Sequence, residues 1–211
     1  MPKSDSYSQG VQYPVLGDAP DIEVQLQTLV NGFVPRLVMR FADANARAAA
    51  LSGGTKPVPG MITYLIAEDR WEGRQADNTW LLLSDGPWQP LSFKTGYNAF
   101  KGSPGWRRKA GGGVELRGQI KRTNDGNLND SSDLIAFASI PKSAAPAALR
   151  VFLTPTRRQT ISGVTRHTAR VEVTSDGALS YFVEAGGGVS VPGGPAWFGL
   201  DGIQFSPAGD D

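Results

Sequence analysis

A stretch of strict two-residue alternation, residues 114–121, constrains the fold of this chain more than any other feature. Three glycines precede it, and its polar positions, Glu115, Arg117, Gln119 and Lys121, alternate with Val114, Leu116, Gly118 and Ile120. A period of two places one set of side chains on a buried face and the other set in water. The basic residues 107–109 before it suggest an exposed edge, where charge discourages unwanted pairing. We therefore expect an early strand of an antiparallel β-domain.

The composition predicts a mainly β protein and excludes several kinds of site. The 26 glycines and 15 prolines recur between short apolar runs, as in strands joined by turns. The absence of cysteine excludes disulfides, iron–sulfur clusters, zinc ribbons and thiol catalysis. A net charge of +1 gives no electrostatic reason to expect a nucleic-acid partner. We predict no cofactor and no bound metal.

No segment of the sequence predicts export or membrane insertion. The polar N-terminus has no apolar core of a signal peptide, and no run of about 18 apolar residues could span a bilayer. We therefore expect synthesis in a cytoplasm and no membrane insertion.

The N-terminal region predicts an arm followed by a helix. Residues 1–20 are polar and would form an extended arm on a neighbouring subunit, or else a frayed terminus. Asp18 or Asp21 can cap a helix within 21–36. The helix has an apolar seam spaced four, three and four, formed by Ile22, Leu26, Leu29 and Phe33. So short a helix is marginal alone, so the seam packs either in a trimer or on its own domain.

Three further regions follow the helix. Residues 37–88 predict a small β-α-β-β module, with Asp43 capping its alanine-rich helix and a charged turn, 68–78, joining the last two strands. Residues 89–105 predict a linker whose aromatic residues pack partly on the next domain. Residues 106–211 contain seven or eight short candidate strands, which predicts an antiparallel β-sandwich of the jelly-roll kind.

The order of landmarks in the second half resembles a known family of domains. Trp106 and a basic arm precede GGVELRG, an apolar strand ends at Ile140 and Pro141, a Ser-Asp-Gly hairpin lies within 174–177, and WFGLDGIQF occupies 197–205. This order is similar to the C-terminal β-domain of many tail-fibre and minor tail proteins of siphoviruses. The 37–88 module resembles one that tail-fibre and base-plate proteins of phages of Gram-positive bacteria carry before their distal domain.

The sequence contains few candidates for catalysis or metal binding. His167 is the only histidine, so a catalytic triad would have to use it, although an exposed strand or turn position is expected. Glycoside cleavage would need two of the carboxylates of Glu115, Glu172, Glu184 and Asp201. The loop within 124–133 offers oxygen ligands for calcium in a spacing unlike an EF-hand, from Asp125, Asn127, Asn129, Asp130 and Asp133. Asn and Asp are also the usual residues of turns.

Aromatic residues of the head domain are the candidates for contact with a receptor. An aromatic face suits the apolar face of a sugar, although most such rings fill the core of a β-domain. The candidates are Tyr181, Phe182, Trp197 and, as a polar neighbour, His167. Tyr181 and Phe182 are adjacent in a strand, so one of the two must face outward.

The resemblance implies a structural protein of a bacteriophage virion and no enzyme. We expect a minor tail or tail-fibre protein that forms a homotrimer at the tail tip and contacts the host surface, with a cell-wall glycan as the candidate receptor. Its N-terminal region is expected to attach to other tail or base-plate proteins. The alternatives are a capsid head-fibre or decoration protein without a receptor role and a hydrolase of host-surface glycans. Binding by three shallow sites on one particle would gain strength through avidity.

Overall fold

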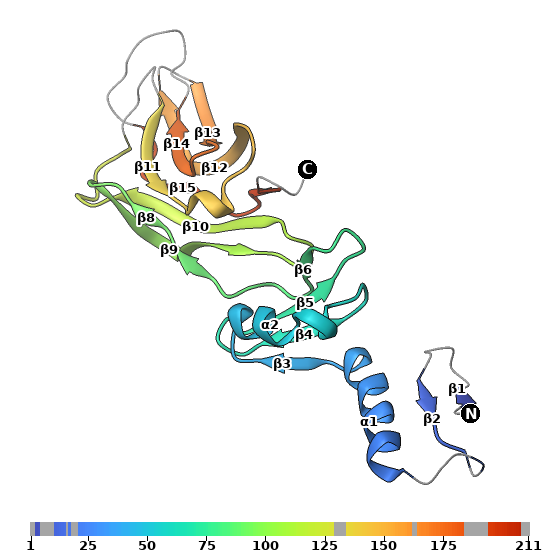
Figure 1. Cartoon of the computed structure of the whole chain (residues 1–211). Coiled ribbons are helices and arrows are strands. Elements are labelled where there is room, and N and C mark those ends of the chain that lie inside the picture. Colours follow the sequence, from blue (N-terminus) through green and yellow to red (C-terminus); the bar gives the residue numbers. More distant parts are fainter. Residues whose placement is uncertain are drawn as a thin grey trace. The chain divides into compact units, whose positions relative to one another are not determined.

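The computed structural model describes residues 3–4, 11–15, 17, 21–128, 134–161, 164–183 and 194–207. The chain divides into two compact units, Met1–Ser84 and Asp85–Asp211, and each is described by itself (Figure 1). Strands dominate the second unit and the chain as a whole, which confirms the prediction of a mainly β protein.

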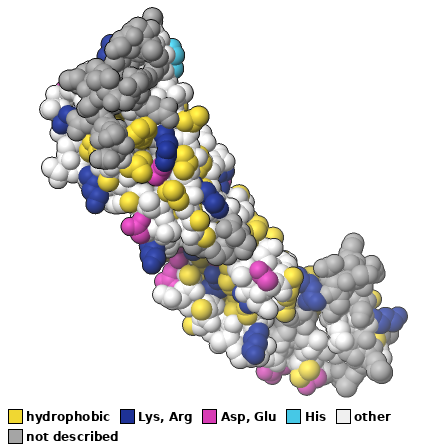
Figure 2. Space-filling model, turned by 90° about the horizontal axis from the view of Figure 1, so that it is seen from above, with side chains coloured by type: hydrophobic (Ala, Val, Ile, Leu, Met, Phe, Trp, Pro, Cys, Tyr) yellow, Lys and Arg dark blue, Asp and Glu magenta, His cyan; other side chains and the backbone are white. Residues whose placement is uncertain are grey.

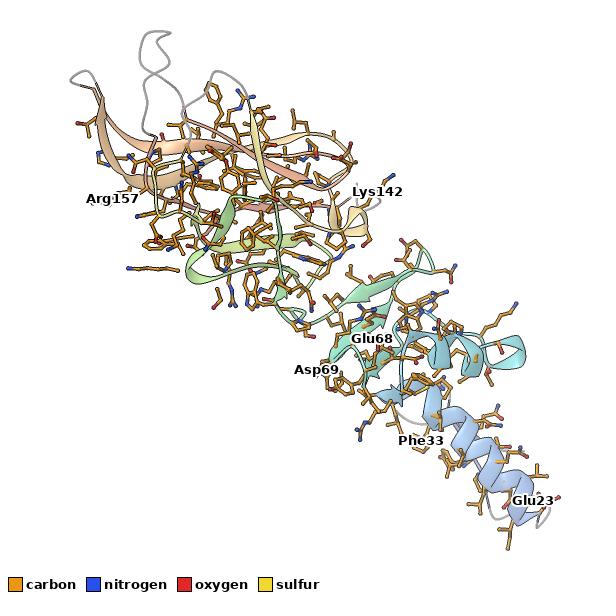
Figure 3. The ribbon with its side chains drawn as sticks, turned by 90° about the vertical axis from the view of Figure 1, so that its left-hand side faces the viewer. Glu23, Phe33, Glu68, Asp69, Lys142 and Arg157 are labelled. Carbon is orange, nitrogen blue, oxygen red and sulfur yellow. The ribbon has the colours of Figure 1, made fainter. Side chains whose placement is uncertain are left out.

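The first unit begins with a two-stranded ribbon and the predicted helix. The antiparallel ribbon consists of β1 (Lys3–Ser4) and β2 (Gln12–Tyr13). Helix α1 (Ile22–Phe33) continues as a 3-10 turn over Val34–Arg36, and Glu23 and Phe33 mark its two ends in Figure 3. Of the two predicted caps, Asp21 is confirmed, because its Oδ1 accepts a hydrogen bond from the amide of Val24 at 3.1 Å.

A mixed four-stranded sheet forms the rest of the first unit. Its order is β3 (Met39–Phe41), β4 (Ile62–Leu65), β5 (Arg70–Arg74) and β6 (Trp80–Leu82). The first pair is parallel and the other two are antiparallel. Helix α2 (Ala44–Ala50) connects the parallel pair, and Asp43 caps it by accepting from the amide of Ala46 at 2.7 Å, as predicted.

The prediction that 68–78 forms only a charged turn was wrong, because the segment contains strand β5. The strand buries Glu72, which is 6% exposed and 2.5 Å from Nη1 of Arg47. Nε of Arg70 lies 2.8 Å from the other carboxylate oxygen. A buried carboxylate is tolerated only with such partners. The pattern of charged residues therefore concealed an inward-facing strand position.

The second unit is a nine-stranded antiparallel barrel that is nearly closed. In sheet order its strands are β7 (Gln89–Pro90), β9 (Tyr97–Arg108), β10 (Val114–Arg122), β15 (Phe198–Gly199), β12 (Arg150–Ile161), β13 (Val164–Val173), β14 (Ala178–Phe182), β11 (Ile135–Ser139) and β8 (Ser92–Phe93). A further short strand, β16 (Gln204–Phe205), pairs with the start of β10. The turn between β13 and β14 is the predicted Ser-Asp-Gly hairpin, with Gly177 at φ 89°.

The prediction of a sandwich was wrong, and the segment 89–93 is the reason. Only Leu91 separates β7 from β8, yet β7 pairs with β9 at one end of the sheet and β8 pairs with β11 at the other. One short segment thus joins the two edges of the sheet, so the sheet curves into a nearly closed barrel. The region 89–105, predicted as a linker with partial packing, therefore contains β7, β8 and much of β9.

The barrel core contains the predicted alternate residues. Val114, Leu116 and Ile120 of β10 are at most 1% exposed. Aromatic rings fill the centre, where Phe137 meets Phe198 edge-to-face with centroids 4.9 Å apart. The alternation of residues 114–121 is confirmed, and it leaves the polar residues of β10 on the outer face of the barrel.

Candidate functional site

A shallow cleft lies on the outer face of the barrel, across four strands that are neighbours in the sheet. Its cavity volume is about 490 Å3. The side chains that line it are Phe100 and Lys101 of β9, Gln119 and Lys121 of β10, Arg157 of β12, Ala196 and Trp197 just before β15, and Asp125 after β10. Arg157 is labelled in Figure 3. The cleft thus combines two aromatic rings with a larger number of polar and charged groups.

A β-bulge places Phe100 in this cleft. The neighbouring residues Gln119 and Ile120 of β10 pair with Lys101 and Ala99 of β9, so Phe100 is the extra residue of its strand. Bulges are often found near functional sites, because they re-aim a side chain. Phe100 is 38% exposed, so its ring is accessible to a ligand.

Trp197 enters the cleft because the chain alternates on entering β15. The next residue, Phe198, is fully buried in the core, so Trp197 faces the opposite side. The carbonyl of Trp197 accepts a hydrogen bond from the amide of Arg157 at 3.2 Å, which fixes it beside β12. Its ring stacks on that of Phe100, with centroids 6.4 Å apart and an interplanar angle of 26°.

Polar side chains surround the two rings. Nζ of Lys121 lies 2.5 Å from Oδ1 of Asp125 and 5.6 Å from the ring centre of Phe100. Nζ of Lys101 lies 5.3 Å from the same ring centre. Gln119 adds an amide, which can both donate and accept hydrogen bonds. The cleft can therefore offer stacking and hydrogen bonds to one ligand.

Only one of the four predicted receptor residues lines the cleft. Trp197 does, whereas Tyr181 is fully buried in the barrel core, where its hydroxyl lies 3.1 Å from that of Tyr97. Phe182 faces outward, half-buried, with the guanidinium of Arg170 6.0 Å from its ring centre. His167 is exposed on β13 and is the cyan side chain in Figure 2. Trp197 therefore belongs to the candidate site, and Tyr181 belongs to the barrel core.

Of the other cleft residues, the sequence predicted a ligand role only for Asp125, as a candidate calcium ligand. Phe100 was assigned to a linker, and only the bulge gives it an outward position. Lys101, Gln119 and Arg157 are ordinary polar residues of strands, and their meeting depends on the order of β9, β10, β15 and β12 in the sheet. The exposed side of the alternation in β10 was the one available signal, and it included both Gln119 and Lys121.

The predicted oligomer seam lies on a helix without any buried residue. Ile22, Leu26 and Phe33 are 71%, 56% and 47% exposed, and Leu29 is half-buried. Exposed apolar side chains at this spacing are typical of a face that a partner covers. The seam therefore remains a candidate interface.

The described carboxylates that were considered for glycoside cleavage each have structural contacts. Oε2 of Glu115 accepts from Nε of Arg107 at 2.8 Å, buried Glu172 pairs with Arg170, and Asp201 accepts from the amide of Gly118 at 2.9 Å. Glu184 lies outside the described residues. These contacts give each of the three carboxylates a structural role.

The proposed calcium loop is described only in part. Asn129, Asp130 and Asp133 lie outside the described residues, and Asp125 pairs with Lys121. Within the described ranges, no three His, Cys, Asp or Glu side chains are grouped as metal ligands would be.

Comparisons with known proteins identify no relative. No protein-family model, no curated protein and no solved structure matches the chain. Among the described helices, none has the length and apolar character needed to cross a membrane.

Proposed function

We propose that this chain is a structural protein of a phage virion, a minor tail or tail-fibre protein at the tail tip that binds a glycan of the host surface. The order of sequence landmarks supports the virion assignment. The observation that supports glycan binding most strongly is the stacked, half-exposed pair Phe100 and Trp197 in a polar cleft. An aromatic face complements the apolar face of a sugar ring, and the surrounding amide and charged groups can bond its hydroxyls.

The proposed mechanism is binding without turnover. A shallow cleft of about 490 Å3 would contact only a short part of a polymer, so one site would bind weakly. Several copies on one virion would convert weak contacts into firm attachment, because each later contact becomes intramolecular. The protein therefore gains from being an oligomer.

The exposed seam of α1 supports a homotrimer. A helix of 12 residues with no buried side chain is marginal in water, and partners that cover Ile22, Leu26, Leu29 and Phe33 would stabilise it. We propose that this region also joins the protein to other tail or base-plate proteins.

The proposed function is tested by location and by binding. Antibodies against the purified protein, visualised on virions by immunogold electron microscopy, should label the tail tip. The purified protein should also sediment with isolated cell walls of the host on which the phage grows. Labelling of the capsid without wall binding would favour a head-fibre or decoration protein instead. Release of reducing ends from the walls would favour a hydrolase.

A further inference from the structure

The cleft has an excess of positive charge, which binding of a neutral sugar would not need. Lys101, Lys121 and Arg157 line it together with a single carboxylate, that of Asp125. The whole chain has a net charge of only +1, so the excess in the cleft is local. Figure 2 shows Lys and Arg side chains dispersed over the visible surface, among apolar and acidic ones.

Two of the three cationic groups are available to a ligand. Lys121 is paired with Asp125, with Nζ and Oδ1 2.5 Å apart. Among the residues that the structure describes, Lys101 and Arg157 have no carboxylate within the 4.0 Å of an ion pair. Both side chains are exposed, so a ligand in the cleft can reach them.

Another basic cluster of the barrel provides a contrast. Arg107 lies 2.8 Å from carboxylate oxygens of both Asp85 and Glu115, and Lys109 lies 3.6 Å from the same two groups. Those two cations are matched by two anions and leave no charge for a ligand. A group of basic residues is thus not by itself a site for an anion, because neighbouring carboxylates can neutralise it.

We infer that the cleft selects a sugar that carries an anionic group, a carboxylate or a phosphate. The sugar ring would lie against Trp197 and Phe100, and the anion would pair with Lys101 or Arg157. A guanidinium suits either anion, since it can donate two parallel hydrogen bonds. The inference rests on the proposed glycan binding and adds the chemical class of the glycan.

A nucleic acid is the other ligand that aromatic and basic groups can bind, through stacked bases and paired phosphates. The cleft favours a sugar, because a nucleic-acid groove follows the backbone over several nucleotides with many cations. Here one short cleft includes a carboxylate, and the chain is nearly neutral.

Calorimetric titration with three forms of one polymer tests the inference. The probes are native cell-wall polysaccharide of the host, the same material with its carboxylates reduced to alcohols, and the same material dephosphorylated with hydrofluoric acid. We expect at least tenfold weaker binding of one treated form, which identifies the anion, and weaker binding of the native form as salt increases. Equal binding of all three forms would overturn the inference of an anionic sugar and would leave the proposed glycan binding in place.

The remaining outcomes separate the two proposals. Failure of the full-length protein to bind native polysaccharide would overturn the proposed glycan function together with the inference. Tighter binding of a single-stranded DNA oligonucleotide than of native polysaccharide would show that the ligand is a nucleic acid and not a sugar.

Variants assign the effect to the cleft. Lys101→Gln and Arg157→Gln should each lower affinity for the native polymer severalfold and lower affinity for the charge-stripped polymer by less, because only the native polymer carries the anion. Lys142→Gln is the matched control, because this exposed lysine lies on a 3-10 turn over Lys142–Ala144, outside the cleft (Figure 3). An equal loss in the control and the two cleft variants would indicate non-specific attraction and overturn the inference. Unchanged melting temperatures would show that all variants fold.

Discussion

The ring of Phe100 stacks on the ring of Trp197 at 6.4 Å, although the two residues belong to distant parts of the chain. Phe100 is the extra residue of a bulge in β9, and Trp197 directly precedes β15. The strand β10 lies between β9 and β15 and pairs with both. The order of the strands therefore brings the two aromatic rings of the cleft together.

Changes at Phe100 should separate binding from stability. Phe100→Leu keeps apolar volume but removes the ring face, so we expect about two- to tenfold weaker binding to host cell walls, since aromatic contacts are worth about 0.5–1.5 kcal/mol. Phe100→Tyr keeps the ring and should bind as the wild type does. Calorimetry measures binding and thermal melting measures stability, and equal binding by the leucine variant would remove Phe100 from the site.

Gly118 should tolerate no side chain. It has φ 89°, and a Cβ atom there would lie 2.6 Å from Cα of Pro104. We expect Gly118→Ala to lower the free energy of unfolding by about 1–3 kcal/mol, through backbone strain and this clash. Gly113→Ala is the control, because its new atom would only touch the carbonyl oxygen of Phe205 at 3.7 Å. Equal urea midpoints for both variants would contradict the expectation.

Removing one partner of the buried ion pair of the first unit should destabilise it strongly, whereas replacing both partners by apolar residues should destabilise it little. Nη1 of Arg47 donates to Glu72 and to Oγ1 of Thr63, and its guanidinium lies 3.9 Å from the ring centre of Trp80. Arg47→Ala should destabilise this unit by about 3–5 kcal/mol, because Glu72 loses a buried partner.

A double variant checks that explanation in the same urea titrations. Arg47→Met together with Glu72→Leu should recover most of the loss, since no charge then remains buried without a partner. A double variant as unstable as Arg47→Ala would show that packing, and not the unpaired carboxylate, causes the loss.

The seam of α1 should control the oligomeric state. Light scattering of the purified protein should give a mass near three times 22.5 kDa at several concentrations. Leu26→Asp together with Leu29→Asp should dissociate the trimer, because charge at a packed apolar seam is unfavourable. Gln27→Asp, a polar neighbour on the same helix, serves as the control. An unchanged mass in the double variant would show that the seam packs within one subunit.

The barrel should lose stability in acid through Asp85 and Glu115. The amide of Ala110 and the nearby Arg107 hold the pKa of Asp85 below its usual value of 3.8. Burial acts to raise the pKa of Glu115, but Arg107 and Lys109 hold it below its usual 4.5. The folded state thus binds protons less readily, so this stabilisation is present above pH 4.5 and is lost as the pH falls through the depressed values.

Melting temperatures measured from pH 6 to pH 3 test this dependence. The wild type should lose stability over the lower part of the range, and the variant with Asp85→Asn and Glu115→Gln should lose less. Parallel pH profiles of the two proteins would show that other groups cause the acid sensitivity.

Local patterns predicted the elements that depend on short-range chemistry. The alternation of β10, the caps Asp21 and Asp43 and the turn at Gly177 all follow from the properties of a few adjacent residues. Trp197 was also predicted as a candidate contact residue from its type, and it lines the cleft.

Features set by distant partners could not be predicted in this way. Strand β5 was missed because buried Glu72 depends on Arg47, from another element. Closure of the barrel was missed because β7 and β8 are too short to have a period. The bulge at Phe100 and the approach of Arg157 to Trp197 exist only once the sheet has formed.

The most direct test of glycan binding through the cleft compares three proteins on isolated host cell walls. The wild type, Trp197→Ala and Phe182→Ala are sedimented with equal amounts of wall, and the bound fraction is measured for each. Phe182 is the matched control, since it is an outward aromatic residue of the same barrel outside the cleft. The account predicts about tenfold weaker binding for Trp197→Ala and wild-type binding for Phe182→Ala. Full binding by Trp197→Ala, with an unchanged melting temperature, would contradict it.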